Sequence, residues 1–245
     1  MQIYRITATI AAGLMLFHSP SSGQTADSPS AEEYYRRGLA EKNEKGCGYA
    51  AESFSKAIEL NPRDARYYKE RGECASLWSR EEALADLDTA IRVDPSYADA
   101  YLARAKVLFH EFRVREMSAA DADKALEDLN KAAMIDPKYP ETFFVRGKLF
   151  FHYFKDVEKA FSDFAQAIEK APSEQRYFVG RASHYRLIGK IEEAIKDYTA
   201  AIGLEPGNKS LYRYRAGAYR ELGKDSLANA DEKKAAELYQ QPPNL

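Results

Sequence analysis

The sequence predicts an all-α protein, a solenoid of about six helix-turn-helix units between residues 31 and 240. The first observation is a pair of alanines seven residues apart that recurs six times, as Ala50/Ala57, Ala83/Ala90, Ala125/Ala132, Ala160/Ala167, Ala194/Ala201 and Ala228/Ala235. The second is a proline five residues after the second alanine in five units, at Pro62, Pro95, Pro137, Pro172 and Pro206. Two helices of this length cannot bury their apolar faces alone, so units of one kind must stack.

The first helix of each unit has its own signature. An aromatic residue is followed four positions later by a small one, in the pairs Tyr34/Gly38, Tyr68/Gly72, Tyr101/Ala105, Phe143/Gly147, Phe178/Ala182 and Tyr212/Ala216. Residues three or four positions apart share a helix face, and a small side chain there lets a second helix approach closely. The proline then ends each second helix, because a proline cannot continue one.

These aromatic, small, alanine and proline positions resemble the tetratricopeptide repeat, a helix-turn-helix unit of about 34 residues. The resemblance covers nearly the whole chain after residue 30 and implies a right-handed α-solenoid. The expected units are 31–64, 65–97, 98–139, 140–174, 175–208 and 209–240, followed by a tail at 241–245. The resemblance further implies that the first helices line a concave groove that holds peptides.

The N-terminus has the pattern of a secretory signal peptide over residues 1–23. Arg5 provides the positive charge, and an apolar run of 12 residues follows from Ile6 to Phe17, too short to span a bilayer. Small residues precede Gln24, where we expect cleavage, and residues 24–30 predict a flexible leader. The alternatives are an uncleaved anchor or a disordered start. We expect an exported protein, periplasmic or secreted, without stable membrane insertion after cleavage.

The charge balance excludes a general nucleic-acid binder. The chain has 36 Lys and Arg against 38 Asp and Glu, a formal net charge of −2, whereas phosphate neutralisation needs clustered basic residues. No phosphate-binding loop, dinucleotide turn or nucleophile with a base is recognisable. We therefore expect no enzymatic activity, no cofactor and no metal site, and the oligomeric state stays open.

The two cysteines are the candidates for a disulfide. Cys47 lies near the start of the second helix of unit one, and Cys74 lies late in the first helix of unit two. Adjacent antiparallel helices in a stacked array place an early position of one beside a late position of the other. Export to an oxidising compartment permits the bond. The alternative is two unrelated buried thiols.

Unit three departs most from the frame. Twenty residues separate Ala105 from Ala125, against 12 in units one, five and six. Ser118 to Asp121 has the spacing of a helix start, so we expect the preceding helix to continue to about Arg115. The extra residues are interpreted either as a contact surface or as a neutral insertion at a tolerant turn.

Two charges also recur with the repeat. An arginine precedes the small residue in every unit, and an aspartate stands three residues after the first alanine in five, at Asp86, Asp128, Asp163, Asp197 and Asp231. Ser53 takes that place in unit one. We expect a ladder of half-buried ion pairs, within or between units, rather than a set of anion sites.

The candidate partner-binding residues lie on one face of the first helices, which we call the groove face. It comprises the positions at −6, −3, +1, +4 and +5 from each small residue. Lys, Phe and His recur there in units three and four, and the predicted contacts are Leu102, Lys106, Phe109, His110, Phe144, Lys148, Phe151, His152 and Arg186. Nine basic and five acidic residues occupy the 30 positions, which favours an acidic and apolar partner. Alternatively, Phe109 and Phe151 pack between helices.

The sequence therefore favours an exported, non-enzymatic scaffold that binds a protein or peptide in its groove. Two alternatives remain open. One is a structural or assembly role in an envelope complex, through convex or end contacts. The other is binding of a small anionic ligand in the same groove.

Overall fold

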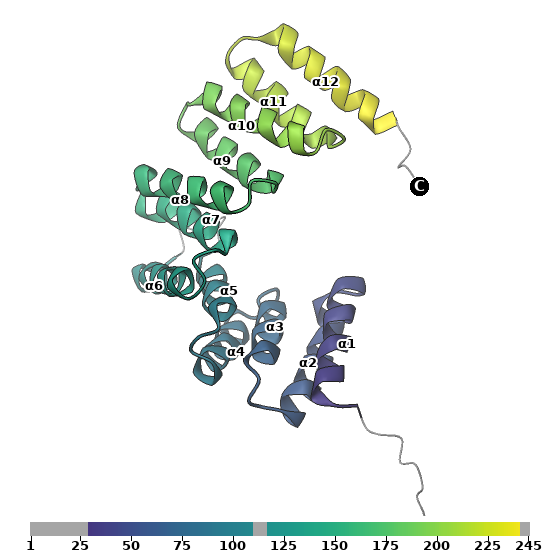
Figure 1. Cartoon of the computed structure of the whole chain (residues 1–245), viewed down its shortest axis with the longest axis vertical. Coiled ribbons are helices and arrows are strands. Elements are labelled where there is room, and N and C mark those ends of the chain that lie inside the picture. Colours follow the sequence, from purple (N-terminus) through teal and green to yellow (C-terminus); the bar gives the residue numbers. More distant parts are fainter. Residues whose placement is uncertain (1–28, 110–116, 241–245) are drawn as a thin grey trace, which may run out of the picture.

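In the part of the chain that the structure describes, twelve α-helices, arranged as six antiparallel pairs, form a single curved array (Figure 1). The structure is a computed structural model that describes residues 29–109 and 117–240. Its elements are α1 (Ala31–Glu44), α2 (Cys47–Leu60), α3 (Ala65–Ala75), α4 (Arg80–Val93), α5 (Ala98–Leu108), α6 (Ala119–Ile135), α7 (Pro140–Leu149), η2 (Phe150–Phe154), α8 (Val157–Lys170), α9 (Gln175–Leu187), α10 (Ile191–Leu204), α11 (Lys209–Glu221) and α12 (Asp225–Gln240). No strand occurs in these described ranges, so the all-helical prediction is confirmed.

The core follows the alanine frame. All twelve repeated alanines are 0% exposed, because each lies where the two helices of a unit, or of neighbouring units, meet. The small residues of the first helices are required for the same reason. A Cβ on Gly147 would lie 2.8 Å from Phe164 Cδ1 and 2.9 Å from the Ala160 carbonyl oxygen. A Cβ on Gly38 or Gly72 would likewise meet side chains of the second helix within about 3 Å, so the units that have glycine here close through contacts too short for a larger side chain.

The helix starts follow local side-chain chemistry. At the start of α1, the Ser30 hydroxyl accepts a hydrogen bond from the Glu33 amide, while the Glu33 side chain accepts one from the Ser30 amide. This is the reciprocal cap that satisfies two otherwise unpaired donors. At the start of α6, Ser118 accepts from the Asp121 amide, as its spacing predicts.

The expected extension of the first helix of unit three is wrong. Helix α5 ends at Leu108, not near Arg115, because Phe109 adopts an extended backbone (φ −98°, ψ 101°). That turn carries the Phe109 ring into the core, where it is 6% exposed and packs in a cluster with Leu108, Leu129 and Leu149. The rest of the expected extension, residues 110–115, lies outside the described residues.

The predicted Arg–Asp ladder is present and lies within the units. In five units the arginine Nε donates to one carboxylate oxygen at 2.8 Å and Nη2 donates to the other, in the pairs Arg71–Asp86, Arg104–Asp128, Arg146–Asp163, Arg181–Asp197 and Arg215–Asp231. In unit one, Arg37 binds Glu41 of its own helix, and the Ser53 hydroxyl donates to the same carboxylate. Each two-pronged bond fixes the register of one helix pair.

The same arginines also reach the preceding unit. Their Nη1 atoms donate to side-chain oxygens on its second helix, in Arg71 to Ser55, Arg104 to Asp88, Arg146 to Asn130 and Arg215 to Thr199. Ala165 occupies the corresponding place before Arg181, and an alanine offers no acceptor. The ladder thus joins helices within a unit and, at four places, neighbouring units.

Candidate protein-binding groove

The first helices of the N-terminal half lie on the inner side of the arc. In Figure 1, α1, α3 and α5 face its open side, while α4, α6 and α8 lie on the outer side. Helices α3 and α5 also contact each other directly, although α4 separates them in sequence. Side chains of the groove face on neighbouring units are therefore close enough to interact.

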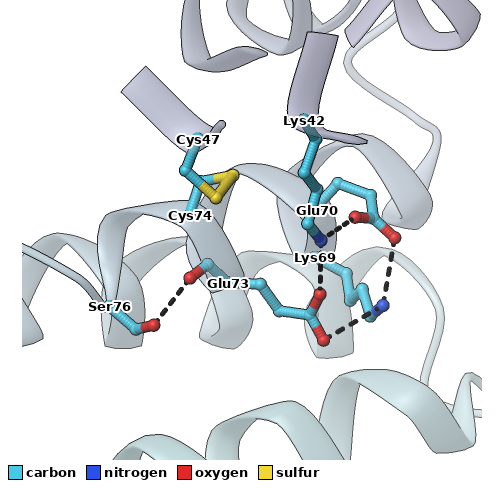
Figure 2. Close-up of a disulfide and its surroundings, with 7 residues drawn as sticks. All are labelled: Lys42, Cys47, Lys69, Glu70, Glu73, Cys74 and Ser76. Atoms are coloured by element: carbon cyan, nitrogen blue, oxygen red, sulfur yellow. Dashed lines mark hydrogen bonds and ion pairs between the residues drawn. A yellow bond between two sulfur atoms is a disulfide. The ribbon is translucent and has the colours of Figure 1, made fainter. Parts of the chain in front are cut away.

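The groove face of units one and two carries a compact ion cluster (Figure 2). Lys42 of α1 binds both Glu70 (2.6 Å) and Glu73 (2.9 Å) of α3. Lys69 binds the same two carboxylates at 3.0 and 3.1 Å. Burial alone would raise the pKa of Glu73, but Lys69 and Lys42 hold it below its usual value. Two cations and two anions thus balance and tie unit one to unit two.

A second cluster joins units three, four and five around Glu141 at the start of α7. Its carboxylate binds Lys106 of α5 at 2.9 Å and Arg176 of α9 at 2.8 Å, and it accepts a hydrogen bond from the Tyr177 hydroxyl at 3.2 Å. Burial would raise the pKa of Glu141, yet the Lys106 and Arg176 cations keep it below its usual range. Lys106 and Arg176 share one carboxylate, and Arg176 also lies 3.8 Å from the Glu174 carboxylate, so two cations and two anions balance here too.

A disulfide stands beside the first cluster. Cys47, the first residue of α2, is bonded to Cys74 near the end of α3, with Cα atoms 5.0 Å apart (Figure 2). Cys74 is 0% exposed, while Cys47 is half-buried. The bond fixes the start of one helix against the end of its antiparallel neighbour, and it therefore holds unit one in place next to the groove.

A pocket opens between the ends of α1, α3 and α5. Its volume is about 690 Å³, and it is lined by Lys42, Cys47, Glu73, Ser76, Leu77, Arg80, Ala103, Lys106, Val107, Leu108, Met117 and Asp121. Five of these residues occupy groove-face positions of units one to three: Lys42, Glu73, Ser76, Leu77 and Lys106. The volume lies within the range of pockets that hold ligands or large side chains.

Comparison with known proteins agrees with this geometry. The family model described as "Tetratricopeptide repeat" matches residues 176–208, which lie in unit five. A crystal structure of PilW, a type IV pilus biogenesis factor, is 13% identical and has a TM-score of 0.73, covering 87% of this chain and 95% of that one. The array has the tetratricopeptide repeat fold.

Two other solved tetratricopeptide repeat proteins are similar. One from Thermus thermophilus is 21% identical with a TM-score of 0.68, covering 78% of this chain and 100% of that one. The other, YrrB, is described as having an unusual peptide-binding site; it is 24% identical with a TM-score of 0.53, covering 77% of this chain and 93% of that one. These likenesses concern the fold.

Curated relatives match over a shorter stretch. A small glutamine-rich tetratricopeptide repeat-containing protein 2 of Mycosarcoma maydis is 32% identical over 91 residues, 37% of this chain. The Hsp70-Hsp90 organizing protein 3 of Arabidopsis thaliana is 33% identical over 88 residues, 32% of this chain. The matched stretch spans only 26% and 16% of the length of these relatives.

Two of the predicted apolar contacts are buried in the helix packing rather than open on the groove face. Leu102 is 4% exposed and Phe109 is 6% exposed, so both belong to the core of unit three. Phe144 packs against Phe164 and Tyr177, and its ring lies where a Cβ on Gly180 would be 2.3 Å away. Packing between helices, the alternative interpretation of the aromatic repeat, thus accounts for Phe109.

Phe151 and His152 lie together in η2. The Phe151 ring packs edge-on against Phe161 and against the buried His184 of α9, and it keeps part of its surface exposed. The Nε2 atoms of His152 and His184 are 3.1 Å apart, and His184 Nδ1 lies 2.7 Å from the Gly180 carbonyl oxygen. An Nδ1 proton therefore faces that carbonyl. His110, the proposed equivalent of His152, lies outside the described residues.

The predicted basic contacts keep more exposure. The Lys106 side chain is 44% exposed despite its bond to Glu141. Lys148 is half-buried with its Nζ 5.6 Å from the centre of the Phe144 ring. Arg186 is bound to Glu221 of α11. The basic surplus counted on the groove face is smaller in the structure, because Asp64 and Glu70, at other offsets, pair with groove-face cations.

The structure adds pocket residues that the repeat pattern did not identify. Val107 and Met117 line the pocket but do not lie at groove-face positions. Leu77 does lie at a groove-face position, but units three and four have no leucine at the equivalent position. Leu77 is 73% exposed and Trp78 is 52% exposed, and two adjacent large apolar side chains in solvent are a signal that could have marked this end of the groove.

The described residues contain neither a candidate metal site nor a candidate membrane-spanning helix. Over residues 29–109 and 117–240, no three His, Cys, Asp or Glu side chains form a group that could hold a metal ion. Within the same part of the chain, no helix is both long and apolar enough to cross a membrane.

Proposed function

We propose that the chain is an exported, non-enzymatic scaffold that binds a protein or peptide through its groove face. Proteins with this repeat are usually non-enzymatic scaffolds and typically mediate protein–protein interactions. The observation that carries the proposal is the pocket on the groove face of units one to three. It combines apolar walls with charged side chains that differ from unit to unit.

Unit-specific residues are what a binding face needs. The Arg–Asp ladder repeats with nearly constant geometry and is largely buried, so it cannot distinguish one partner from another. The groove face instead changes along the array, from two lysines that share Glu70 and Glu73 to the cluster in which Lys106 and Arg176 share Glu141. Such variation on a constant frame favours a partner recognised at defined places.

Export is the second part of the proposal. It rests on residues 1–23, which lie outside the described residues, and on the Cys47–Cys74 bond. Disulfides persist in oxidising compartments and are rare in the cytosol. We therefore place the protein and its partner in the periplasm or outside the cell. Cell fractionation checks this by showing which compartment contains the protein.

Acidic and apolar groups are the chemistry we propose for the partner. Lys106 and Lys148 stand at the same position of adjacent first helices, and Phe151 adds an aromatic surface one turn further on. Exposed charges are screened over roughly 8–10 Å at physiological salt, so part of the affinity should be salt-sensitive.

The test is capture of the native partner with the charge-reversed variant Lys106→Glu with Lys148→Glu. We expect the fold to persist and the captured partner to fall at least about tenfold, because a reversed charge repels what the lysine attracts. The matched control is Lys131→Glu with Lys196→Glu. It makes the same charge change at two exposed positions on the second helices α6 and α10.

The capture distinguishes the alternatives. If the groove variant captures as much partner as the wild type while the control variant loses it, contact occurs through the second helices, as in an assembly role. If small anions such as phosphate or citrate compete fully with capture, the groove binds an anionic ligand instead. Either result overturns the proposed function.

A further inference from the structure

The pocket between α3 and α5 has an apolar wall and a charged rim. Ala103, Val107 and Leu108 of α5 form one side, and Leu77 and Met117 approach from the segments that follow α3 and precede α6. Leu77 is 73% exposed, so this wall extends into solvent at the mouth of the pocket. A partner side chain that entered would bury apolar surface on both sides.

The charges of the rim are unequally balanced. Lys42 is bound to Glu73, and Arg80 is bound to Asp121 at 2.9 Å, and both acids line the pocket themselves. Lys106 differs, because its acid, Glu141, is not a lining residue and is shared with Arg176. Asp99, an acid on the same helix, stands seven residues before Lys106. It is about 10 Å away along the helix axis, which is too far for an ion pair with Lys106. A new carboxylate would therefore be attracted to the Lys106 side of the pocket.

We propose that this pocket receives one large apolar side chain of a linear peptide segment whose neighbouring Asp or Glu binds Lys106. The inference rests on the proposed function and names the partner's recognition element: an apolar anchor beside an acid. Trp78, 52% exposed next to Leu77, provides further apolar area on which the flanking peptide packs. Aromatic and aliphatic anchors in partly enclosed pockets carry most of the energy of such contacts.

The test uses a library of random twelve-residue peptides displayed on phage and selected against the full oxidised chain. We expect the enriched peptides to share a large apolar residue beside Asp or Glu. Fluorescence anisotropy should then show that Leu77→Glu and Lys106→Glu each weaken binding of an enriched peptide by about tenfold or more. Both positions are exposed, and circular dichroism would verify that the variants fold.

The repeat provides matched controls. Leu187 holds in unit five the position that Leu77 holds in unit two, and it is 66% exposed. Lys131 is an exposed lysine on the second helix α6, outside the groove face. We expect Leu187→Glu and Lys131→Glu to change the affinity less than about twofold. A peptide with Lys in place of its acid should bind Lys106→Glu more tightly than the wild type.

Three other results would overturn the pocket. Peptides that bind equally to wild type, Leu77→Glu and Lys106→Glu occupy another part of the groove, and the proposed function stands without the pocket. Enriched peptides that lack the apolar residue or the acid contradict the recognition element. Failure to enrich any peptide, together with no groove-dependent capture, removes the pocket and the proposed function alike.

Discussion

The Arg–Asp ladder and the groove-face clusters are both made of ion pairs, but they obey different rules. The ladder repeats in five units with the same two-pronged geometry, and four of its aspartates are buried, from 1% exposed at Asp128 to 6% at Asp231. The two groove clusters differ from each other in their residues, each shares a carboxylate between two cations, and Lys106 keeps part of its surface exposed. Repetition marks the frame of the array, whereas variation marks the face available to a partner.

Unit one lacks a two-pronged ladder pair of its own. It has Ser53 where the other units have aspartate, and its Arg37 side chain is 65% exposed and bound to its own helix. The disulfide and the Lys42 cluster connect this unit to the next, together with the hydrogen bond from Arg71 to Ser55. The N-terminal unit thus depends on bonds that also frame the pocket.

The largest effect should come from removing the disulfide. The bond closes a separation of 27 residues, and cross-links of this span stabilise by about 3–4 kcal/mol. We expect Cys47→Ala with Cys74→Ala to lower the free energy of unfolding of the N-terminal units by that amount in urea titrations. Reduction of the wild type by dithiothreitol should reproduce the shift. If the first unfolding transition is unchanged in both the double variant and the reduced wild type, the Lys42 cluster is sufficient to hold unit one without the disulfide.

The ladder should come next in size. Asp163→Ala leaves the Arg146 guanidinium, 18% exposed as a side chain, without its carboxylate, and should destabilise by about 1–3 kcal/mol. Glu192→Ala, at an exposed position of α10, should cost little. Chemical denaturation of both variants makes the comparison, and equal small losses would mean that the ladder does not stabilise the frame.

A groove-face pair should contribute less to stability than a ladder pair. Lys106→Met removes a half-exposed cation from Glu141, which keeps Arg176 and the Tyr177 hydroxyl, so the loss should stay below about 1 kcal/mol. Thermal unfolding of Lys106→Met beside Asp163→Ala checks the order. If Lys106→Met were the more destabilising of the two, the division between frame and binding face would fail.

The smallest expected effect is on how stability changes at acidic pH. Glu141 has a pKa below its usual value of 4.5, so its contribution to stability is present above that value and is lost as the pH falls through the lower, folded-state pKa. Asp128 of the ladder has the opposite sign, since burial raises its pKa.

Glu141→Gln should therefore make the decline of stability from about pH 5 to about pH 3 shallower than in the wild type. Urea midpoints measured at several pH values provide the comparison, with Glu192→Gln as the control that leaves the slope unchanged. A steeper decline in Glu141→Gln would contradict the assigned direction.

The sequence was sufficient for the frame because the frame repeats. Alanine pairs, small residues and prolines recur often enough that chance matches are eliminated, and the ladder followed from two charges at fixed places. The structure then decided one question that spacing could not. The carboxylate bonds lie within units, and the arginine Nη1 atoms also reach the preceding unit.

The groove was harder to predict because its details occur once. Offsets along a helix describe a face only while the helix continues, and α5 stops at Leu108, which turns Phe109 into the core. Charge counted over one face also omits acids on the next, and Glu70 neutralises groove-face lysines from such a position. Residues that depend on one turn or one neighbour leave no periodic signal.

Site-specific photo-crosslinking in the native cells tests the central claim most directly. A benzophenone amino acid would replace Leu77 or Lys148 on the groove face and, as controls, Lys131 or Lys196 on the second helices. We predict that illumination joins the native partner to the groove-face positions and not to the controls. Adducts formed only at Lys131 or Lys196 would contradict the assignment and place the functional contact on the outer helices.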